Sequence, residues 1–287
     1  MNSTQHDAVI VGGGLAGIVT ALELLRAGKT VALLDRDTPE RLGGLALWAF
    51  GGMALVGTPL QARMKIPDTP EIALRDWLRF GELDAGDEYP LAWARHYVQH
   101  SRAQVHDWLL NEGVTFMPAV NWVERGLHGD GNSLPRYHIV WGTSRHMTER
   151  LIAALRQAGA GGRLTLLHRH RVTGVDRQGG QIAGVNAIDE TSGAEVRLQA
   201  PVVVLAMGGI NGSHAEARKN WPADRPCPAA MLNGAHPLAD GALHHWAAEQ
   251  LGAPITHAGE MWNYAAGIPH PFPHFTGHGL SLIPCKS

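Results

Sequence analysis

Residues 9–19 have the sequence VIVGGGLAGIV, in which four glycines and one alanine separate two apolar runs. A glycine inside a strand or helix costs about 0.5–1 kcal/mol relative to alanine, so such a cluster needs a geometric reason. Gly12, Gly14 and Gly17 give the spacing G-x-G-x-x-G. Between a strand and a helix, this spacing provides a tight turn, a close approach of pyrophosphate to the backbone, and close packing of helix on strand. The stretch therefore predicts a dinucleotide site.

The flanking residues have the pattern of a strand, a helix and a second strand. Residues 8–11 are apolar, residues 15–27 show helical periodicity, and residues 30–34 form another apolar run that ends at Asp35. An acid at that position can accept hydrogen bonds from a ribose. The first 35 residues thus predict a βαβ unit with parallel strands, which is the opening of a doubly wound α/β fold.

The remaining sequence predicts an insertion and a second set of strands. Amphipathic helices are expected at 69–79 and 91–112, and a further helix at 147–158. A β-meander is expected from the strand candidates 164–167, 172–176, 182–188 and 195–199. Residues 201–207 predict a strand that returns to the central sheet, and residues 240–252 a helix capped by Asp240.

Composition limits the class of protein. The 287 residues contain 24 Lys and Arg against 26 Asp and Glu, so charge gives no reason to expect a nucleic acid or an anionic membrane as partner. Two cysteines and scattered histidines suggest neither a disulfide framework nor a metal site. The N-terminus lacks a basic region, and glycines interrupt its apolar run. We therefore expect a cytoplasmic protein without membrane insertion.

Two further glycine pairs, Gly43–Gly44 and Gly51–Gly52, flank an apolar stretch after the second strand. Bare backbone at these turns would let the far end of an extended cofactor approach. Two ordinary loop turns account for the pairs equally well. The nucleotide motif by itself does not decide between NAD and FAD.

Several segments together resemble one family. The stretch at 9–37, VVVLAMGG at 202–209 and ADGALHHWAAEQLGA at 239–253 resemble the FAD-binding half of the fumarate reductase/succinate dehydrogenase flavoprotein superfamily, which includes 3-ketosteroid dehydrogenases. WAFGGM, GNSLPRYHIVWGT, RKNWP and MWNYAAGI resemble segments of a group of FAD-binding dehydrogenases within it. The resemblance runs through essentially the whole chain.

The resemblance implies an oxidoreductase that binds FAD and a small-molecule substrate and transfers hydride to or from a carbon–carbon bond. Gly12, Gly14 and Gly17 would hold the pyrophosphate, and Asp35 the adenosine ribose. The flavin side would contact Gly43, Gly44, Gly51 and Gly52, and the main chain of Val172 would contact adenine. The other residues implied near the cofactor are Leu15, Ala16, Arg36, Ala206, Gly208, Gly209, Asp240 and Gly241. Because no histidine follows a glycine pair in the context of a covalent flavin link, dissociable FAD is expected.

The implied fold is a Rossmann-like FAD-binding domain with a central parallel sheet, a β-meander and a helical insertion. The FAD-binding domain would comprise residues 1–58 and 143–260, with the insertion at 59–142 packed on it. Residues 261–287 would begin a cap or substrate domain. Members of the family are longer, so the chain is expected to be truncated, and a fragment that keeps the nucleotide cradle without turnover is an alternative.

The catalytic acid or base is not identifiable from the sequence. Candidates in family-like motifs are Arg136, Tyr137, His138 and Tyr264, for each of which packing or an ion pair is the preferred interpretation. Leu45 stands where the family often has a polar residue, which removes one hydrogen bond near the flavin. A third hypothesis, an NAD(P)-linked reductase, would need a Tyr-x-x-x-Lys or similar pair, which the sequence lacks. A redox partner and a homo-oligomer are both left open.

Overall fold

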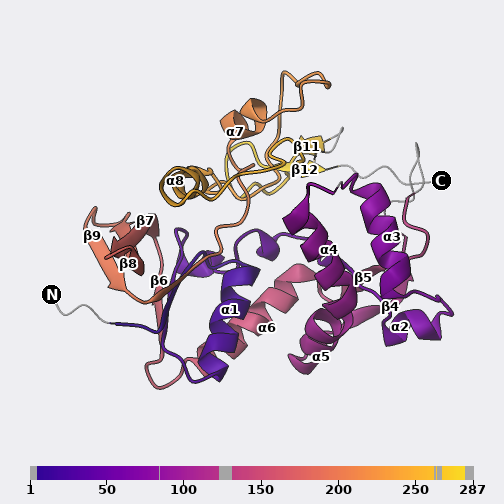
Figure 1. Cartoon of the computed structure of the whole chain (residues 1–287), viewed down its shortest axis with the longest axis horizontal. Helices are drawn as coiled ribbons and strands as arrows, with labels where there is room; N and C mark the ends of the chain where they lie inside the picture. Colours follow the sequence, from indigo (N-terminus) through magenta and orange to yellow (C-terminus); the bar gives the residue numbers. More distant parts are fainter. Residues whose placement is uncertain (1–4, 84, 123–130, 262, 264–266, 282–287) are drawn as a thin grey trace. The chain divides into compact units, whose positions relative to one another are not determined.

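The computed structural model describes residues 5–83, 85–122, 131–261, 263 and 267–281 (Figure 1). The chain divides into two compact units, which are described separately. Unit 1 comprises Met1–Leu45 and Leu155–Ser287, and unit 2 comprises Ala46–Ala154. Among the described residues, no helix combines the length and the apolar character needed to cross a bilayer.

Unit 1 contains a four-stranded parallel sheet, which confirms the central sheet expected from the sequence. Its strands, in spatial order, are β10 (Val202–Leu205), β1 (Ala8–Val11), β2 (Val31–Leu34) and β6 (Leu164–Leu167). Every residue of β1 and β2 is buried. A continuous apolar run is typical of a strand that is covered on both faces, and this explains why both central strands could be recognised in the sequence.

The position of β6 corrects one expectation. Residues 164–167 were expected in the β-meander, but β6 pairs in parallel with β2, with Leu34 beside Leu167. The strand follows the long helix α6 (Thr143–Ala158). A parallel strand requires a crossover connection, which is usually a helix. The helix before residues 164–167 was therefore the sequence signal that separates this strand from the meander.

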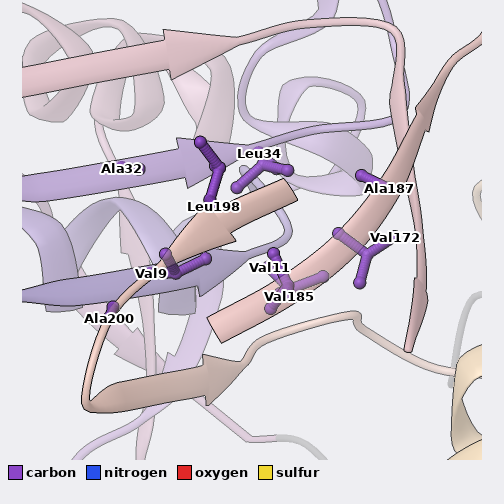
Figure 2. Packing of buried hydrophobic residues seen from close by; sticks show 9 residues of the cluster. All are labelled: Val9, Val11, Ala32, Leu34, Val172, Val185, Ala187, Leu198 and Ala200. Atoms are coloured by element: carbon purple, nitrogen blue, oxygen red, sulfur yellow. The ribbon is translucent and has the colours of Figure 1, made fainter. Parts of the chain in front are cut away.

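The β-meander covers one face of the parallel sheet. It consists of the antiparallel strands β7 (His170–Gln178), β8 (Gln181–Asp189) and β9 (Glu195–Gln199). Figure 2 shows Val9, Val11, Ala32 and Leu34 of the sheet gathered with Val172, Val185, Ala187, Leu198 and Ala200. Successive side chains of a strand point to opposite faces, so Ile10 and Leu33 face away from the meander. Helix α1 (Leu15–Arg26) contacts β1 and β2 and buries Ile18, Leu22 and Leu25.

Short elements complete unit 1. These are the 3₁₀ turn η1 (Pro39–Arg41), the helices α7 (His214–Lys219) and α8 (Ala242–Leu251), and the hairpin of β11 (Gly267–Pro269) and β12 (Gly279–Ser281). The 3₁₀ turn η2 (Gly44–Leu47) begins in unit 1 and ends in unit 2. The prediction that Asp240 is the N-cap of the last helix was wrong. Gly241 is the N-cap, with a left-handed φ of 77°, and Asp240 only accepts a 3.1 Å bond from the amide of Ala242. Glycine adopts this conformation without the steric cost that a side chain brings.

Unit 2 combines helices with a small antiparallel sheet. Its helical elements include α2 (Pro59–Arg63), α3 (Pro70–Phe80), α4 (Glu88–His100), the π-helical segment η3 (Ser101–Asp107), α5 (Trp108–Asn111) and α6 as far as Ala154. The sheet has the order β3 (Gly52–Ala54), β5 (Tyr137–Val140), β4 (Phe116–Asn121). Helices were expected at 69–79 and 91–112, and the sheet was not. Pro118 lies in edge strand β4, where the pairing register shifts between Phe116 and Val120. Proline is tolerated at such positions but removes the strand signal.

Candidate functional site

The glycine-rich turn between β1 and α1 lies at the carboxyl edge of the parallel sheet. Gly12 donates a 2.8 Å hydrogen bond to the carbonyl of Leu34 and has a φ of 106°. A Cβ on Gly12 would collide with the carbonyl group of Ala206, and a Cβ on Gly17 would collide with the carbonyl oxygen of Gly12. The protein's own packing therefore requires glycine at these two positions.

Gly14 is different from its neighbours, because none of the described residues requires it to be glycine. Its φ is −75° and its ψ is −177°, which any residue can adopt. A Cβ built at Gly14 would meet no atom within 4 Å in the part of the chain that the structure describes. Gly14 is also the N-cap of α1, so the positive end of this helix is bare of side chains at that point. The turn presents open backbone at a helix N-terminus, an arrangement that binds phosphate groups.

Asp35 orders this turn from the end of β2. Its Oδ2 atom accepts a 2.5 Å hydrogen bond from the amide of Gly13, and its Oδ1 atom accepts a 2.7 Å bond from the amide of Asp37. A Cβ on Gly13 would lie 2.6 Å from the Leu42 side chain and 2.8 Å from Asp35 Oδ2. An ionised carboxylate has about four acceptor positions. Two are used by amides, so the carboxylate keeps capacity for hydroxyl groups of a ligand.

The first of the two later glycine pairs joins the turn. The amide of Gly43 donates a 2.8 Å bond to the carbonyl of Gly13, and Gly43 forms an isolated parallel bridge with Gly14. Gly44 has a φ of 57°, and the nearest atom to a Cβ built there would be the Cα of Gly14, at 3.7 Å. Bare backbone from the two segments thus lies side by side.

The second pair is explained by unit 2 alone. Gly51 has a φ of 88°, and a Cβ there would lie 2.7 Å from the amide nitrogen of Ser144. A Cβ on Gly52 would enter the ring of Tyr137, which lies on the neighbouring strand. Close packing against the start of α6 accounts for Gly51 and close packing inside the small sheet accounts for Gly52, so the assignment of this pair to the cofactor stays a prediction.

The end of β10 supplies a second stretch of open backbone beside Gly12. The amide of Ala206 donates a 2.8 Å bond to the carbonyl of Val11. Gly208 and Gly209 are exposed, and a Cβ on either would meet no atom of the described residues within 4 Å. His244 on α8 bonds the carbonyl of Gly208 at 3.0 Å. This histidine was missed in the sequence, because only the fold places it beside the strand end.

An unsatisfied polar atom follows the same strand. The Oδ1 atom of Asn211 is buried and has no hydrogen-bond partner among the described residues. Buried polar groups in proteins are nearly always paired, so an orphaned atom next to open backbone indicates a site for a bound molecule or water. Nothing in the sequence around Asn211 had indicated this.

Arg36 and Asp240, both expected at the cofactor, bond each other. Arg36 Nη1 lies 2.7 Å from Asp240 Oδ2, and its Nε lies 3.2 Å from Glu190 Oε1. Burial raises the pKa of Asp240, but bonds from the Ala242 amide and from Arg36 outweigh it and hold this pKa below its usual value. This ion pair ties the end of β2 to Asp240, the residue before the N-cap Gly241 of α8.

Val172 lies on the inner face of the meander, where its side chain is part of the core in Figure 2. Its backbone pairs with Ala187, and the register shifts directly afterwards, so that Gly174 is opposite Asn186. Such a bulge leaves one residue of the strand out of the regular ladder. A main-chain contact from Val172 to a ligand stays a prediction.

Two of the four candidate acid/base residues, Arg136 and His138, are buried in unit 2. Arg136 bonds Asp68 through Nε and Nη2, each at 2.8 Å, and Asp76 through Nη1 at 2.7 Å. His138 lies 2.8 Å from Thr58 Oγ1 and 2.7 Å from the carbonyl of Arg136, and burial lowers its pKa. These contacts agree with the preferred ion-pair interpretation of Arg136. Tyr264 lies outside the described residues.

The described part of the chain holds no group of three or more His, Cys, Asp or Glu side chains that could bind a metal ion. The chemistry of the carboxyl edge of the sheet is instead that of backbone amides, one carboxylate and open glycines. This set of groups fits a phosphate-containing ligand with a sugar.

Comparisons with known proteins agree with this interpretation. A family model described as FAD binding domain matches residues 7–286. A KsdD-like steroid dehydrogenase of Mycobacterium tuberculosis is 36% identical over 299 residues, which cover 98% of this chain and 52% of the relative. The chain thus spans about half the length of the curated relatives it matches.

Two solved structures show the same fold. A 3-ketosteroid-Δ4-(5α)-dehydrogenase from Rhodococcus jostii RHA1, in complex with 4-androstene-3,17-dione, is 22% identical with a TM-score of 0.72. The match covers 89% of this chain and 55% of that one. A flavocytochrome c3 fumarate reductase in an open conformation is also 22% identical, with a TM-score of 0.69, and the match covers 86% of this chain and 40% of that one.

Proposed function

The chain belongs to the FAD binding domain family, and we propose that it acts as an FAD-dependent oxidoreductase on a carbon–carbon bond of a steroid-like small molecule. FAD is the cofactor that the family and the flavoprotein relatives establish. The substrate class is proposed from the steroid dehydrogenases among the relatives.

Gly14 is the observation that carries the proposal. Because neither its backbone conformation nor its surroundings require glycine, the missing side chain is explained by a ligand that approaches the backbone. The N-terminus of α1 would stabilise the pyrophosphate of FAD, and the two free acceptor positions of Asp35 would bind the adenosine ribose. Gly44, Gly208 and Gly209 offer further open backbone along the cofactor.

When bound, FAD supplies the hydride chemistry, and the protein binds and orients the reactants. In unit 1 the bond from His244 to the carbonyl of Gly208 fixes the peptide that would face the cofactor. The ion pair of Arg36 and Asp240 fixes the start of α8 in the same unit. The proton donor or acceptor stays unassigned.

Titration of the purified chain with FAD tests the proposal, with flavin fluorescence and the visible spectrum as the signals. We expect Gly14→Val to weaken binding at least tenfold, equivalent to about 1.4 kcal/mol, because its side chain would occupy the phosphate position. Gly234→Val is the matched control. A Cβ at Gly234 would also meet no atom of the described residues within 4 Å, and Gly234 is not among the residues expected to contact the cofactor. Equal affinity of the Gly14 variant and the wild type would refute the assignment.

Turnover needs a separate measurement, because binding of FAD does not establish catalysis. The FAD-loaded chain should reduce an artificial electron acceptor in the presence of a 3-ketosteroid, with the bleaching of the flavin spectrum as an independent signal. Tight FAD binding without any steroid-dependent reduction would instead favour a nucleotide-binding chain that does not complete turnover.

The proposal extends to the cellular location and the assembly of the protein. We place the protein in the cytoplasm, with support from the presence of only two cysteines in 287 residues. We propose a redox partner as well, since an oxidoreductase must pass its electrons to an acceptor. A homo-oligomer is the alternative kind of partner. Fractionation and sedimentation of the tagged protein would test these points.

A further inference from the structure

His168 lies next to Asp35 at the carboxyl edge of the parallel sheet. The amide of Asp35 donates a 2.8 Å bond to the carbonyl of Leu167, and the amide of His170 donates a 3.0 Å bond to the carbonyl of Asp35. The hydrogen bonding between β2 and β6 therefore continues past the ends of both strands, and His168 lies between the two residues, Leu167 and His170, that bond the backbone of Asp35. In open parallel sheets, ligands bind outside the carboxyl ends of the strands.

The turn that carries His168 is unusual and well fixed. Arg169 has a φ of 58°, a left-handed conformation that is uncommon for a residue with a side chain. Its amide donates a 3.0 Å bond to the carbonyl of Asp37, and its carbonyl accepts a 2.8 Å bond from the amide of Glu190. Local strain of this kind persists where the surroundings hold it, and it occurs often at binding sites.

The imidazole of His168 makes no hydrogen bond to the described residues. Its Nδ1 atom is buried without a partner there. By contrast, Nδ1 of the neighbouring His170 bonds the carbonyl of His168 at 2.6 Å. A buried nitrogen without a partner is unfavourable, and no bond holds the ring in this orientation. A ligand that offers a hydrogen bond would therefore favour a rotated ring.

The surroundings set the charge of this ring. Burial lowers the pKa of His168, and the charged or titratable groups within electrostatic range are Asp35, Arg156, Glu40 and His170. A neutral imidazole has one donor nitrogen and one acceptor nitrogen. A ring with one donor and one acceptor nitrogen suits a hydroxyl group, because a hydroxyl both donates and accepts hydrogen bonds. The oxygens of Asp35 already accept amide bonds, whereas His168 has its full capacity unused.

We propose that His168 is a specificity-determining residue for the adenosine half of FAD, and that its ring bonds a ribose hydroxyl next to Asp35. The inference rests on the proposed function, because it assumes that FAD occupies the carboxyl edge of the sheet. It assigns to His168 no part in the hydride transfer. The ring should therefore distinguish FAD from FMN, which has the flavin and one phosphate but no adenosine.

The test compares the binding of FAD and FMN by isothermal titration calorimetry in four variants. His168→Leu removes both nitrogens, His168→Asn and His168→Gln restore an amide near Nδ1 or Nε2, and His214→Leu is the control on an exposed histidine of α7. We expect His168→Leu to bind FAD about tenfold more weakly and FMN unchanged. One of the two amide variants should recover most of the loss. Thermal unfolding of each apo variant verifies that it is folded.

The outcomes separate the two claims. If the wild type does not bind FAD, the proposed function fails together with this inference. If the wild type binds FAD and His168→Leu binds it equally well, only the inference fails. A loss of affinity for FMN as large as that for FAD would also overturn it, because the effect would then be structural. In a ¹⁵N NMR spectrum, FAD but not FMN should shift the ring nitrogens of His168.

Discussion

Replacement of Arg136 by methionine tests how unit 2 uses its buried charges. The guanidinium is bonded to Asp68 and Asp76, and the exposed fractions of the three side chains are 6%, 0% and 1%. Burial lowers the pKa of Arg136, and the bonds to the two carboxylates more than reverse this effect, so the group stays charged. Arg136→Met keeps most of the side-chain volume and leaves the buried carboxylate of Asp68 without its cation, whereas Asp76 keeps an ion pair with Arg79 at 3.2 Å.

The magnitude follows from the fate of those carboxylates. Removal of one partner from a buried ion pair typically costs 3–5 kcal/mol, because the remaining charge is not compensated. Asp76 keeps bonds from the amide and the hydroxyl of Ser133, at 2.8 and 2.7 Å, and Asp68 keeps a 3.0 Å bond from Gln61. We therefore expect the free energy of unfolding to fall by about 3–4 kcal/mol at pH 7, within that range.

The effect should depend on pH in a defined direction. Burial raises the pKa of Asp76, but the bonds from Ser133 and Arg136 outweigh it and lower the pKa. A lowered folded-state pKa stabilises the wild type above the unfolded-state pKa of about 3.9, and this contribution is lost as the pH falls through the folded-state value. The difference between wild type and Arg136→Met should therefore shrink below pH 4.

Urea denaturation monitored by tryptophan fluorescence measures both effects. Arg145→Met is the matched control, since Arg145 pairs with Glu149 at 3.5 Å with exposed fractions of 52% and 57%. An exposed pair of this kind contributes about 0.5 kcal/mol or less. A cost for Arg136→Met that is no larger than for the control, or that is constant from pH 7 to pH 3, would refute the reasoning.

Two further predictions concern the glycine-rich turn and a buried histidine. Gly17→Ala should lower the free energy of unfolding by about 1–3 kcal/mol, because its Cβ meets the carbonyl oxygen of Gly12. Gly14→Ala should change the free energy of unfolding by less than about 0.5 kcal/mol. Equal effects of the two substitutions in urea titrations would contradict this prediction. Because burial lowers the pKa of His138, the unfolded chain binds the proton first as the pH falls below about 6.5, and stability decreases by up to about 1.4 kcal/mol per pH unit. His138→Gln should reduce that slope between pH 6.5 and 5, and an unchanged slope would exclude His138 as its source.

The central sheet could be predicted because its sequence signals are local. Residues 8–11 form a strand that is buried throughout, and they are followed by a helix with a regular apolar stripe. The strands at 164–167 and 195–199 were also placed at their observed bounds. The strands closest to residues 164–167 in the sequence do not indicate their pairing partner. The partner is the distant strand β2, which residues 164–167 reach through the crossover helix α6.

Unit 2 was harder to predict for the opposite reason. The strand at 116–121 contains Pro118 and buries only one of its six residues, so it shows no alternation. The strand at 137–140 follows a Gly-, Asn- and Pro-rich stretch that indicates a loop. The two strands pair with each other, and the strand at 137–140 also pairs with β3; this is tertiary context that a local pattern does not contain.

The glycines of the candidate site are present for two different reasons, close packing and the approach of a ligand. In the sequence, Gly12, Gly14 and Gly17 form a single motif, whose spacing predicts a tight turn at the first, a close approach of pyrophosphate at the second and helix–strand packing at the third. In the structure, two of them are excluded from bearing a side chain by neighbouring carbonyl groups, and Gly14 is not. Close packing alone therefore explains the glycines at positions 12 and 17. A ligand is needed only for Gly14, so a substitution there separates recognition of FAD from folding, and no other position of the motif can do so.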